Sequence, residues 1–264
     1  MLPAEREQVV LSLIEKKKFV SVSELSQACS VSEMTIRRDL ARLEERGLLV
    51  RTYGGGIGPS GVGAESPFLE RSVQNAESKR AIAEVAAGLV EPNECIGIDV
   101  GTTTLEFSRR LTAKGLTVVT SSLAVLNELL GRSGFEVICT GGILRERDRS
   151  FVGTIAERTL GDLCMDKSFI GVAGIDRDQG FTAYNMHDAA VKRVMIEHSR
   201  EVIILADSSK FGKRAFARVA PIRAADVVAC DGNTPAEWTD WLRKNGVRVV
   251  IAPFSQEERH AQSG

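Results

Sequence analysis

The chain has 264 residues, of which 43% are hydrophobic and 26% charged, a balance typical of a soluble globular protein with room for two ordinary domains. Its formal net charge is −1, so a nucleic-acid-binding surface would have to be a local patch. No apolar run is long enough to span a bilayer and no N-terminal signal pattern is present, so we expect a cytoplasmic protein without a membrane partner.

The cysteines and histidines do not form a metal-binding pattern. The five cysteines are scattered without a CxxC pair, and Cys95, Cys139 and Cys230 stand inside apolar runs. This indicates reduced packing residues of a cytosolic protein. The three histidines at positions 187, 198 and 260 are far apart in the sequence. We therefore expect no metal and no cofactor.

The first two predicted helices are short. Residues 4–17 carry apolar residues at helical spacing, and Ser21 with Glu24 three residues later fits the capping box that starts a second helix, which runs to about Cys29.

A third helix is predicted from Ser32, a good N-cap, to about Arg46, where Gly47 would end it. Ile36, Leu40 and Leu43 fall at i, i+4 and i+7 and should form one buried stripe. The opposite face carries Arg38 and Arg42, and Thr35 and Arg37 flank that face.

Residues 48–56 predict a short β-hairpin after this helix. Together these elements predict a winged helix-turn-helix, whose third helix fits the DNA major groove. From Ser32 to Tyr53 the chain has five arginines and four acidic residues, so geometry rather than net charge supports DNA binding. A solvated amphipathic helix, or a small three-helix core with another role, stays an alternative.

Glycine, proline and serine dominate residues 57–66, which predicts a flexible linker, while residues 67–78 are either part of it or pack on the next domain. We expect a DNA-binding domain at 1–57, a linker at 58–78 and an α/β domain at 79–264. In the last, apolar strands alternate with helices, which predicts a mostly parallel, covered sheet. The expected strands are 94–100, 116–120, 136–140, 168–175, 201–206, 226–229 and 247–252, and the expected helices include 123–131, 154–163, 185–198 and 235–244.

Several of these strands end in polar or glycine-rich segments, at the edge of the sheet where ligands normally bind. Asp99 and the run Gly101–Thr104 end the first strand, and their hydroxyls and free amides could hold an anion such as a phosphate. Residues 120–122, 140–142 and 171–176 end the next three strands. Together these ends favour a pocket for a small anionic ligand. The first loop alone could equally be a helix cap, and the Walker pattern for nucleotide hydrolysis is absent.

Two later segments carry further candidate contacts. Asp188 and Lys192 stand four residues apart on one predicted helix, and without further context they are interpreted as an ordinary surface ion pair. Lys210 follows another apolar strand and is either an anion contact or a solvated lysine.

The segment TIRRDLARLEERGLLVRTYGG resembles the helix-turn-helix signature of DeoR-type bacterial transcriptional regulators. The segments IDVGTTTLEFSRRL, TVVTSSL, CTGG, DKSFIGVAGID, NMHDAAVKR and LADSSKFG resemble the sensor domain of that family. The resemblance covers about Glu5 to Ala252. It implies a homodimeric or homotetrameric repressor of a sugar-catabolic operon that binds double-stranded operator DNA and responds to a phosphorylated sugar. It also implies a sensor fold similar to ribose-5-phosphate isomerase.

Carried over position by position, the resemblance implies two sets of site residues. The DNA-binding set is Ser32, Thr35, Arg37, Arg38, Arg42, Arg51, Tyr53, Gly54 and Gly55. The effector-binding set is Asp99, Gly101, Thr102, Thr103, Thr104, Ser122, Thr140, Gly141, Gly142, Asp176, Asn185, Asp188, Lys192 and Lys210.

Three positions depart from the family pattern. Tyr53 stands where histidine is common, Ser121 replaces a common asparagine, and Asp188 is shorter than the usual glutamate. The last two could change which sugar fits. The alternative function is a phosphosugar isomerase with an appended DNA-binding domain, with Asp99, Asp176 or Asp188 as the base. The acidic cluster that isomerases carry after the fourth strand is reduced here to GVAGID, so we expect no catalytic residues and no enzymatic activity.

Overall fold

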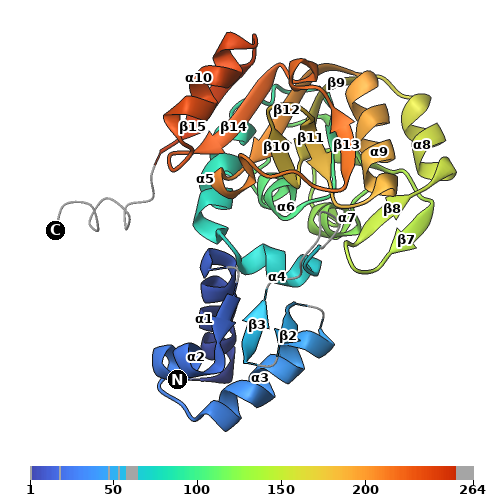
Figure 1. Ribbon diagram of the computed structural model, residues 1–264. Coiled ribbons are helices and arrows are strands. Elements are labelled where there is room, and N and C mark those ends of the chain that lie inside the picture. Colours follow the sequence, from blue (N-terminus) through green and yellow to red (C-terminus); the bar gives the residue numbers. More distant parts are fainter. Residues whose placement is uncertain (1, 18, 47, 53, 58–64, 254–264) are drawn as a thin grey trace. The chain divides into compact units, whose positions relative to one another are not determined.

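The computed structural model describes residues 2–17, 19–46, 48–52, 54–57 and 65–253. The chain divides into two compact units, Met1–Pro67 and Phe68–Gly264 (Figure 1). Within the described residues, no helix combines the length and the apolar character that crossing a membrane requires. The predicted linker residues 58–64, Gly47 at the predicted helix end, and Tyr53 of the predicted wing lie outside the described residues.

The N-terminal unit is a winged helix-turn-helix, as predicted. Its three strands form one antiparallel sheet in the order β1-β3-β2, and β1 was not anticipated from the sequence. The elements are α1 (Pro3–Lys17), β1 (Phe19–Ser21), α2 (Val22–Cys29), α3 (Glu33–Glu45), β2 (Val50–Thr52) and β3 (Gly55–Ile57).

The predicted caps of α2 and α3 are confirmed. Ser21 accepts a hydrogen bond from the Glu24 amide at 3.2 Å, and the Glu24 carboxylate accepts one from the Ser21 amide at 2.9 Å. The Ser32 hydroxyl accepts from the Thr35 amide at 3.3 Å. These bonds satisfy amides that the first turn of a helix leaves free, so the sequence itself defines both helix starts.

The C-terminal unit is built on a seven-stranded parallel sheet in the order β15-β14-β12-β9-β4-β5-β6. Each of its strands overlaps one of the predicted strands, so the predicted α/β class is confirmed. The chain enters at β4, continues to β5 and β6, and then returns to β9 on the other side of β4. The strand order therefore reverses between β4 and β9, which is the place where parallel sheets bind ligands. The strands are β4 (Cys95–Ile98), β5 (Leu116–Thr120), β6 (Phe135–Cys139), β9 (Met165–Gly171), β12 (Ser199–Ala206), β14 (Val227–Asp231) and β15 (Arg248–Ala252).

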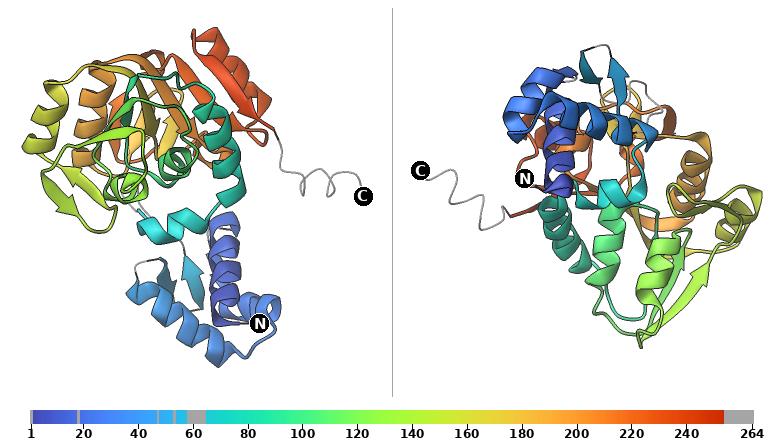
Figure 2. Two further views of the ribbon diagram at one scale, coloured as in Figure 1. Left: turned by 180° about the vertical axis from the view of Figure 1, so that it is seen from behind. Right: turned by 90° about the horizontal axis from the view of Figure 1, so that it is seen from below.

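Helices cover both faces of this sheet (Figures 1 and 2). Neighbouring residues of one strand face opposite cores: Phe169 packs with Ile82 of α5 (Ala76–Ala87) and Phe107 of α6, whereas Ile170 packs with residues of α8, α9 and α10. Burial on both faces explains why the strands are nearly continuous apolar runs. The remaining helices are α4 (Phe68–Val73), α6 (Thr102–Arg109), α7 (Leu123–Leu129), α8 (Thr154–Gly161), α9 (Met186–Glu197) and α10 (Ala236–Lys244).

The sequence-based expectation of one strand over 168–175 is wrong. β9 ends at Gly171, and β10 (Gly174–Asp176) leaves the parallel sheet to join β11 (Gly180–Ala183) and β13 (Ala217–Ala220) in an antiparallel sheet. Apolar periodicity did not reveal the break, because Val172 and Ala173 are buried like the strand residues around them. A second hairpin, β7 (Ile143–Arg145) with β8 (Ser150–Val152), was also not anticipated.

Candidate DNA-binding surface and effector site

Helix α3 presents an exposed cationic face. Ile36, Leu40 and Leu43 are buried in the core of the N-terminal unit, as predicted. Arg38 and Arg42 are exposed, and neither side chain has a hydrogen bond or ion pair with another described residue. An exposed, unpaired guanidinium can donate to a phosphate or a base edge without first giving up a partner.

The other two arginines of the predicted DNA-binding set are already engaged. The Arg51 Nε lies 2.6 Å from the Glu44 Oε2, and the Arg51 amide donates to Oε1 of the same carboxylate at 2.9 Å. Arg37 makes a longer contact of 3.4 Å with Glu33, one turn earlier. DNA phosphates would have to compete with these acids, most strongly at Arg51.

The first turn of α3 adds one residue that sequence analysis did not select. Ser32 and Thr35 lie within 2.9 Å of each other through their hydroxyls, and Thr35 is half-buried. Met34 beside them is 68% exposed. An exposed apolar side chain on the first turn of a recognition helix could contact a thymine methyl group. The period of the buried stripe could have identified this position as outward-facing.

The wing glycines have different surroundings. Gly54 is exposed, with open space where a side chain would stand. At Gly55 an added Cβ would lie 2.1 Å from the carbonyl oxygen of Val20. Gly55 is therefore required by the close approach of β3 to β1, which is a packing reason distinct from the predicted DNA contact.

A buried ion pair within the N-terminal unit was missed by sequence analysis. Arg6 of α1 and Asp39 of α3 are 8% and 2% exposed. The Arg6 Nε and Nη2 both donate to the Asp39 carboxylate, the second at 3.2 Å. This contact holds the recognition helix on α1. The sequence interval of 33 residues gives no local signal for it.

In the C-terminal unit, Asp99 lies at the point where the strand order reverses. It follows β4 directly and is fully buried. Its amide donates to the Phe169 carbonyl at 3.0 Å, and its Oδ2 accepts from the Gly171 amide at 3.0 Å, so both contacts reach β9. Oδ2 also accepts from the Nζ of Lys192, which is itself buried on α9.

Two buried oxygens in the residues that directly follow β4 and β5 have no hydrogen-bond partner among the described residues. They are Oδ1 of Asp99 and the hydroxyl of Ser121, and both are buried. Burial raises the pKa of the Asp99 carboxyl, and the charge of Lys192 only partly opposes that effect. Buried polar atoms are normally hydrogen-bonded, so an unpaired acceptor at a strand end is where a ligand hydroxyl can donate.

The start of α6 lies in the same place. Gly101 is its N-cap, and Thr102, Thr103 and Thr104 form its buried first turn. The Thr104 hydroxyl donates to the Gly101 carbonyl at 3.0 Å. A Cβ on Gly171 would lie 3.9 Å from the Cα of Gly101, so the two glycines bring the ends of β4 and β9 together. The free amides and hydroxyls of such a turn favour an anion.

The ends of β5 and β6 have clear structural roles. Ser122 caps α7 by accepting from the Val125 amide at 3.2 Å. Thr140 is buried, and Gly141 and Gly142 adopt positive φ angles of +64° and +110°. A Cβ on Gly142 would lie 2.7 Å from the Val152 carbonyl oxygen, so this turn requires glycine.

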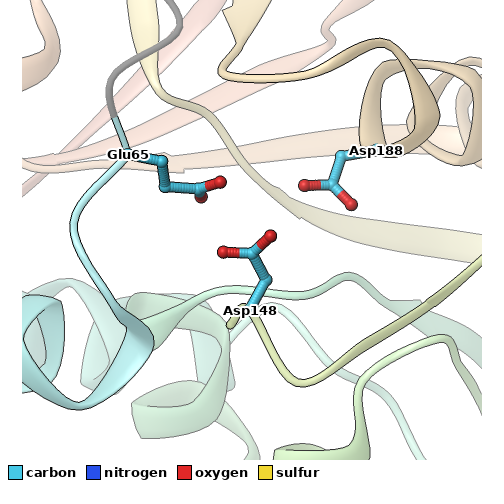
Figure 3. Close-up of side chains that lie close together, drawn as sticks. All are labelled: Glu65, Asp148 and Asp188. Carbon is cyan, nitrogen blue, oxygen red and sulfur yellow. The ribbon is translucent and has the colours of Figure 1, made fainter. Parts of the chain in front are cut away.

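Asp188 is the centre of a second polar cluster. Figure 3 shows Asp188 and Asp148 with their carboxylates turned toward one another; Glu65, also labelled there, belongs to the other unit. The Asp188 carboxylate accepts from Asn185 at 2.6 Å, from Arg145 at 3.0 Å and from the hydroxyl of Ser150 at 3.3 Å. Arg145 also pairs with Asp148 at 2.8 Å. Its guanidinium thus supplies the positive charge that two facing carboxylates require.

The interpretation of Asp188 and Lys192 as a surface ion pair is wrong. Both residues are buried, and they point to different partners: Lys192 pairs with Asp99, and Asp188 pairs with Arg145. Spacing on a helix could not show this, because both partners come from distant parts of the chain.

Asp176 serves the turn between β10 and β11. One of its oxygens accepts from the amides of Asp178 and Gln179 at 2.9 and 2.8 Å and from Arg214 at 3.0 Å. The hydrogen bond from Arg214 is the main cause that lowers the pKa of Asp176. A turn-forming role therefore explains this residue, which the resemblance assigned to the effector.

Lys210 stands in a short 3₁₀ turn after β12, next to Asp207. Burial opposes ionisation of Asp207, but the charges of Lys210 and Lys79 and the hydrogen bonds from Ser209 outweigh it and lower its pKa. Burial lowers the pKa of Lys79, on α5, to about 8. Sequence analysis missed Lys79, Asp207, Arg145 and Asp148, since no local pattern marks a lone charged residue as buried.

Comparisons with known proteins match both parts of the chain. Residues 6–60 match the model of the DeoR-like helix-turn-helix domain, and residues 74–232 match that of the DeoR C terminal sensor domain. The chain is 36% identical over 250 residues to the HTH-type transcriptional regulator GlpR of Haloferax volcanii, covering 95% of this chain and 98% of that protein. It is 33% identical over 252 residues to the glycerol-3-phosphate regulon repressor of Escherichia coli K12, covering 95% of this chain and all of that protein. Among solved structures, ribose 5-phosphate isomerase A from Methanocaldococcus jannaschii matches with a TM-score of 0.39 at 16% identity, over 52% of this chain and 55% of that one.

Proposed function

The chain belongs to the DeoR family of DNA-binding transcriptional regulators, and from this premise we propose that it represses a sugar or carbohydrate catabolic operon under the control of a phosphorylated sugar. The C-terminal unit is the sensor, and the repressed operon is the one whose metabolite it binds. The name of the E. coli relative, a glycerol-3-phosphate regulon repressor, supports a phosphorylated effector.

Operator recognition is assigned to α3 and the wing. Arg38 and Arg42 would contact phosphates or base edges first, since both are exposed and unpaired within the described residues. Thr35 and Arg37 flank them, and Gly54 lets the wing approach the backbone. A plot of log K against log salt concentration tests this assignment: the slope should be steeply negative because neutralised phosphates release counterions. A flat plot would contradict groove binding by the arginines.

Effector binding is assigned to the edge of the sheet at which β4 and β9 end. The phosphate would bind the first turn of α6, at Gly101–Thr104, where amides and hydroxyls favour an anion. Lys192 and Lys210 add positive charge, and Asn185 and Asp188 offer polar atoms to the sugar. Ser122, Thr140, Gly141 and Gly142 would shape the far side of the pocket.

One observation carries this proposal: the buried Oδ1 of Asp99 has no partner among the described residues, at the point where the strand order reverses. A sugar hydroxyl would supply the missing hydrogen bond. Calorimetric titration of the full chain with a panel of sugar phosphates and their unphosphorylated parents tests it. We expect one phosphorylated compound to bind and its parent to bind at least about tenfold more weakly, since a charge-assisted contact is lost. Equal affinity of a phosphate and its parent would contradict the assignment.

We propose that the site does not turn its ligand over. An isomerase needs a carboxylate free to move a proton between adjacent carbons. Asp188 and Asp176 are held by Arg145 and Arg214, and the one free oxygen of Asp99 is assigned to accept from a ligand hydroxyl. Incubation of the pure protein with ribose 5-phosphate should leave the substrate unchanged. Turnover that Asp176→Ala abolishes would favour the isomerase alternative.

We propose that the active form is a homodimer or homotetramer in the cytoplasm, without a membrane partner. Two recognition helices must sit about 34 Å apart, or a multiple of it, to read successive turns of the major groove. The effector would act by favouring one arrangement of subunits over another, which requires different affinity for the two. Small-angle scattering with and without saturating effector should differ. Identical scattering profiles would contradict an effect of the ligand on the arrangement of subunits.

A further inference from the structure

The short helix α4 begins the C-terminal unit and is held by residues that neighbour the effector site. The Phe68 amide donates to the Arg147 carbonyl at 3.1 Å, and the Phe68 side chain packs in a small core with Leu105 and Ala124. Leu105 follows the first turn of α6, and Ala124 follows the Ser122 cap of α7. At the other end, the buried Nζ of Lys79 donates to carbonyls of the last turn of α4 and the residue after it.

A row of four charged side chains connects α4 to Asp188. The Arg71 Nη2 of α4 lies 3.3 Å from the Asp148 Oδ1, and the Asp148 Oδ2 lies 2.8 Å from the Arg145 Nη2. The Arg145 Nη1 lies 3.0 Å from the Asp188 Oδ2. Both carboxylates are buried, Asp148 at 1% and Asp188 at 6% exposure.

We propose that this row is a relay through which occupancy of the effector site changes the hold on α4, the helix that joins the sensor to the segment leading from the DNA-binding unit. The proposal rests on the proposed function, because it takes Asp188 as an effector contact. Arg71, Asp148 and Arg145 act as positioning residues and need not touch the ligand.

The direction of the effect follows from the sharing of Arg145. In the described structure one guanidinium serves two buried carboxylates, and a buried carboxylate requires a partner. A ligand hydroxyl that donates to Asp188 replaces Arg145 there. Arg145 can then turn both terminal nitrogens toward Asp148, in the bidentate geometry that guanidinium and carboxylate prefer. Asp148 then depends less on Arg71, whose contact is the longest of the three, and α4 loosens.

Hydrogen exchange of the full chain, read by mass spectrometry on peptides covering residues 68–75, tests the relay without any ligand. Asp188→Asn imitates occupancy, because it weakens the contact with Arg145, and Asp148→Asn weakens the ion pair with Arg71. We expect each to speed amide exchange in α4 by roughly fivefold or more, as local opening becomes easier. Lys167→Gln is the control: it removes a half-buried ion pair with Glu94, far from α4 in the sequence, and α4 exchange should not change.

A double-mutant cycle separates relay from general loosening. In an Arg145→Gln background, Asp188→Asn should no longer change α4 exchange, since the connecting side chain is absent. An equal effect of Asp188→Asn in both backgrounds, or unchanged α4 exchange in Asp148→Asn, overturns the relay. If Asp148→Asn does not fold, Arg71→Gln breaks the same contact from the less buried side. Calorimetry with the sugar-phosphate panel tests the proposed function separately. Binding without any change of α4 exchange overturns only the relay. Absence of binding overturns the proposed effector, and the variants still decide whether the row couples Asp188 to α4.

Discussion

Two buried, long-range ion pairs, Arg6 with Asp39 in the N-terminal unit and Lys192 with Asp99 in the C-terminal unit, differ in how completely the carboxylate is bonded. In the N-terminal unit, Arg6 donates to both oxygens of Asp39. In the C-terminal unit, Lys192 and the Gly171 amide both bond to one oxygen of Asp99, and the other oxygen has no partner among the described residues.

The difference separates a structural pair from a site. A buried carboxylate with both oxygens bonded offers no free acceptor to a ligand, and its removal leaves the opposite charge buried without compensation. A buried carboxylate with one unbonded oxygen lowers the free energy of unfolding. A ligand that donates a hydrogen bond to that oxygen recovers part of this loss. Its position where the strand order reverses makes Asp99 the better candidate for recognition, and Asp39 the better candidate for folding.

The largest effect is expected at Asp39. Asp39→Ala should destabilise the N-terminal unit by about 3–5 kcal/mol, because it removes the buried carboxylate that faces the Arg6 guanidinium. Denaturant unfolding followed by circular dichroism measures this, and operator binding should be lost with the fold. Glu33→Ala is the control, because its exposed contact with Arg37 should contribute less than about 0.5 kcal/mol. Equal stability of the two variants would contradict the structural role given to the pair of Arg6 and Asp39.

Asp99→Asn should weaken effector binding, and it should also destabilise the sensor because it leaves the buried Lys192 ammonium without its carboxylate. Burial raises the pKa of Asp99, so the folded unit binds this proton more tightly than the unfolded chain does. The contribution of Asp99 to stability therefore falls as pH rises through its unfolded and then its folded pKa, and a neutral amide avoids that loss. We expect about tenfold to hundredfold weaker effector binding by calorimetry. We also expect a flatter pH dependence of sensor unfolding above pH 4. Unchanged effector affinity would contradict the role given to Oδ1.

Arg38→Ala tests whether free arginines contribute more to DNA binding than paired ones. If Arg38 contacts a base, the substitution should weaken operator binding by about 1–3 kcal/mol. If Arg38 contacts a phosphate, the slope of log K against log salt concentration should become less negative by about one. The fold should not change, since the side chain is exposed. Arg51→Ala should cost less, because Glu44 already occupies that guanidinium. Fluorescence anisotropy at several salt concentrations distinguishes the two variants, and a larger loss for Arg51→Ala would reverse the ranking.

The smallest effect is a pH dependence at Lys79. Burial lowers its pKa to about 8, whereas the unfolded chain keeps this proton to about pH 10.4. Between these values the unfolded state binds more protons, so wild-type stability should rise relative to Lys79→Met as pH increases from 8 toward 10. Differential scanning calorimetry at pH 7.5 and 9.5 measures the change. If the difference in Tm between wild type and Lys79→Met does not vary with pH, folding does not lower the pKa of Lys79.

Local patterns predicted the helices, strands and caps well, because their causes lie within a few residues. The stripe of α3, the capping box at Ser21 and the apolar parallel strands all follow from spacing in the sequence. The short strand β1 was missed because it forms only by pairing with β3 of the wing.

The partners within the sites could not be predicted in the same way. Lys192 and Asp99 are 93 residues apart, and Arg71 and Asp148 are 77 apart. Which charges meet depends on the strand order, and the reversal at β4 brings distant strand ends together. Spacing therefore suggested a pairing of Asp188 with Lys192 that does not form, while Arg145, the residue that Asp188 contacts, was overlooked.

The most direct test is operator release by the effector in wild type and Asp99→Asn. Fluorescence anisotropy of the full chain on DNA from upstream of its own gene cluster would be titrated with sugar phosphates and their unphosphorylated parents. We predict that one phosphorylated compound shifts operator affinity of the wild type, that its parent does not, and that Asp99→Asn binds the same DNA but responds at much higher concentration. A wild type that binds the operator yet responds to no phosphorylated compound, or a variant with the full response, would contradict the proposed sensor site.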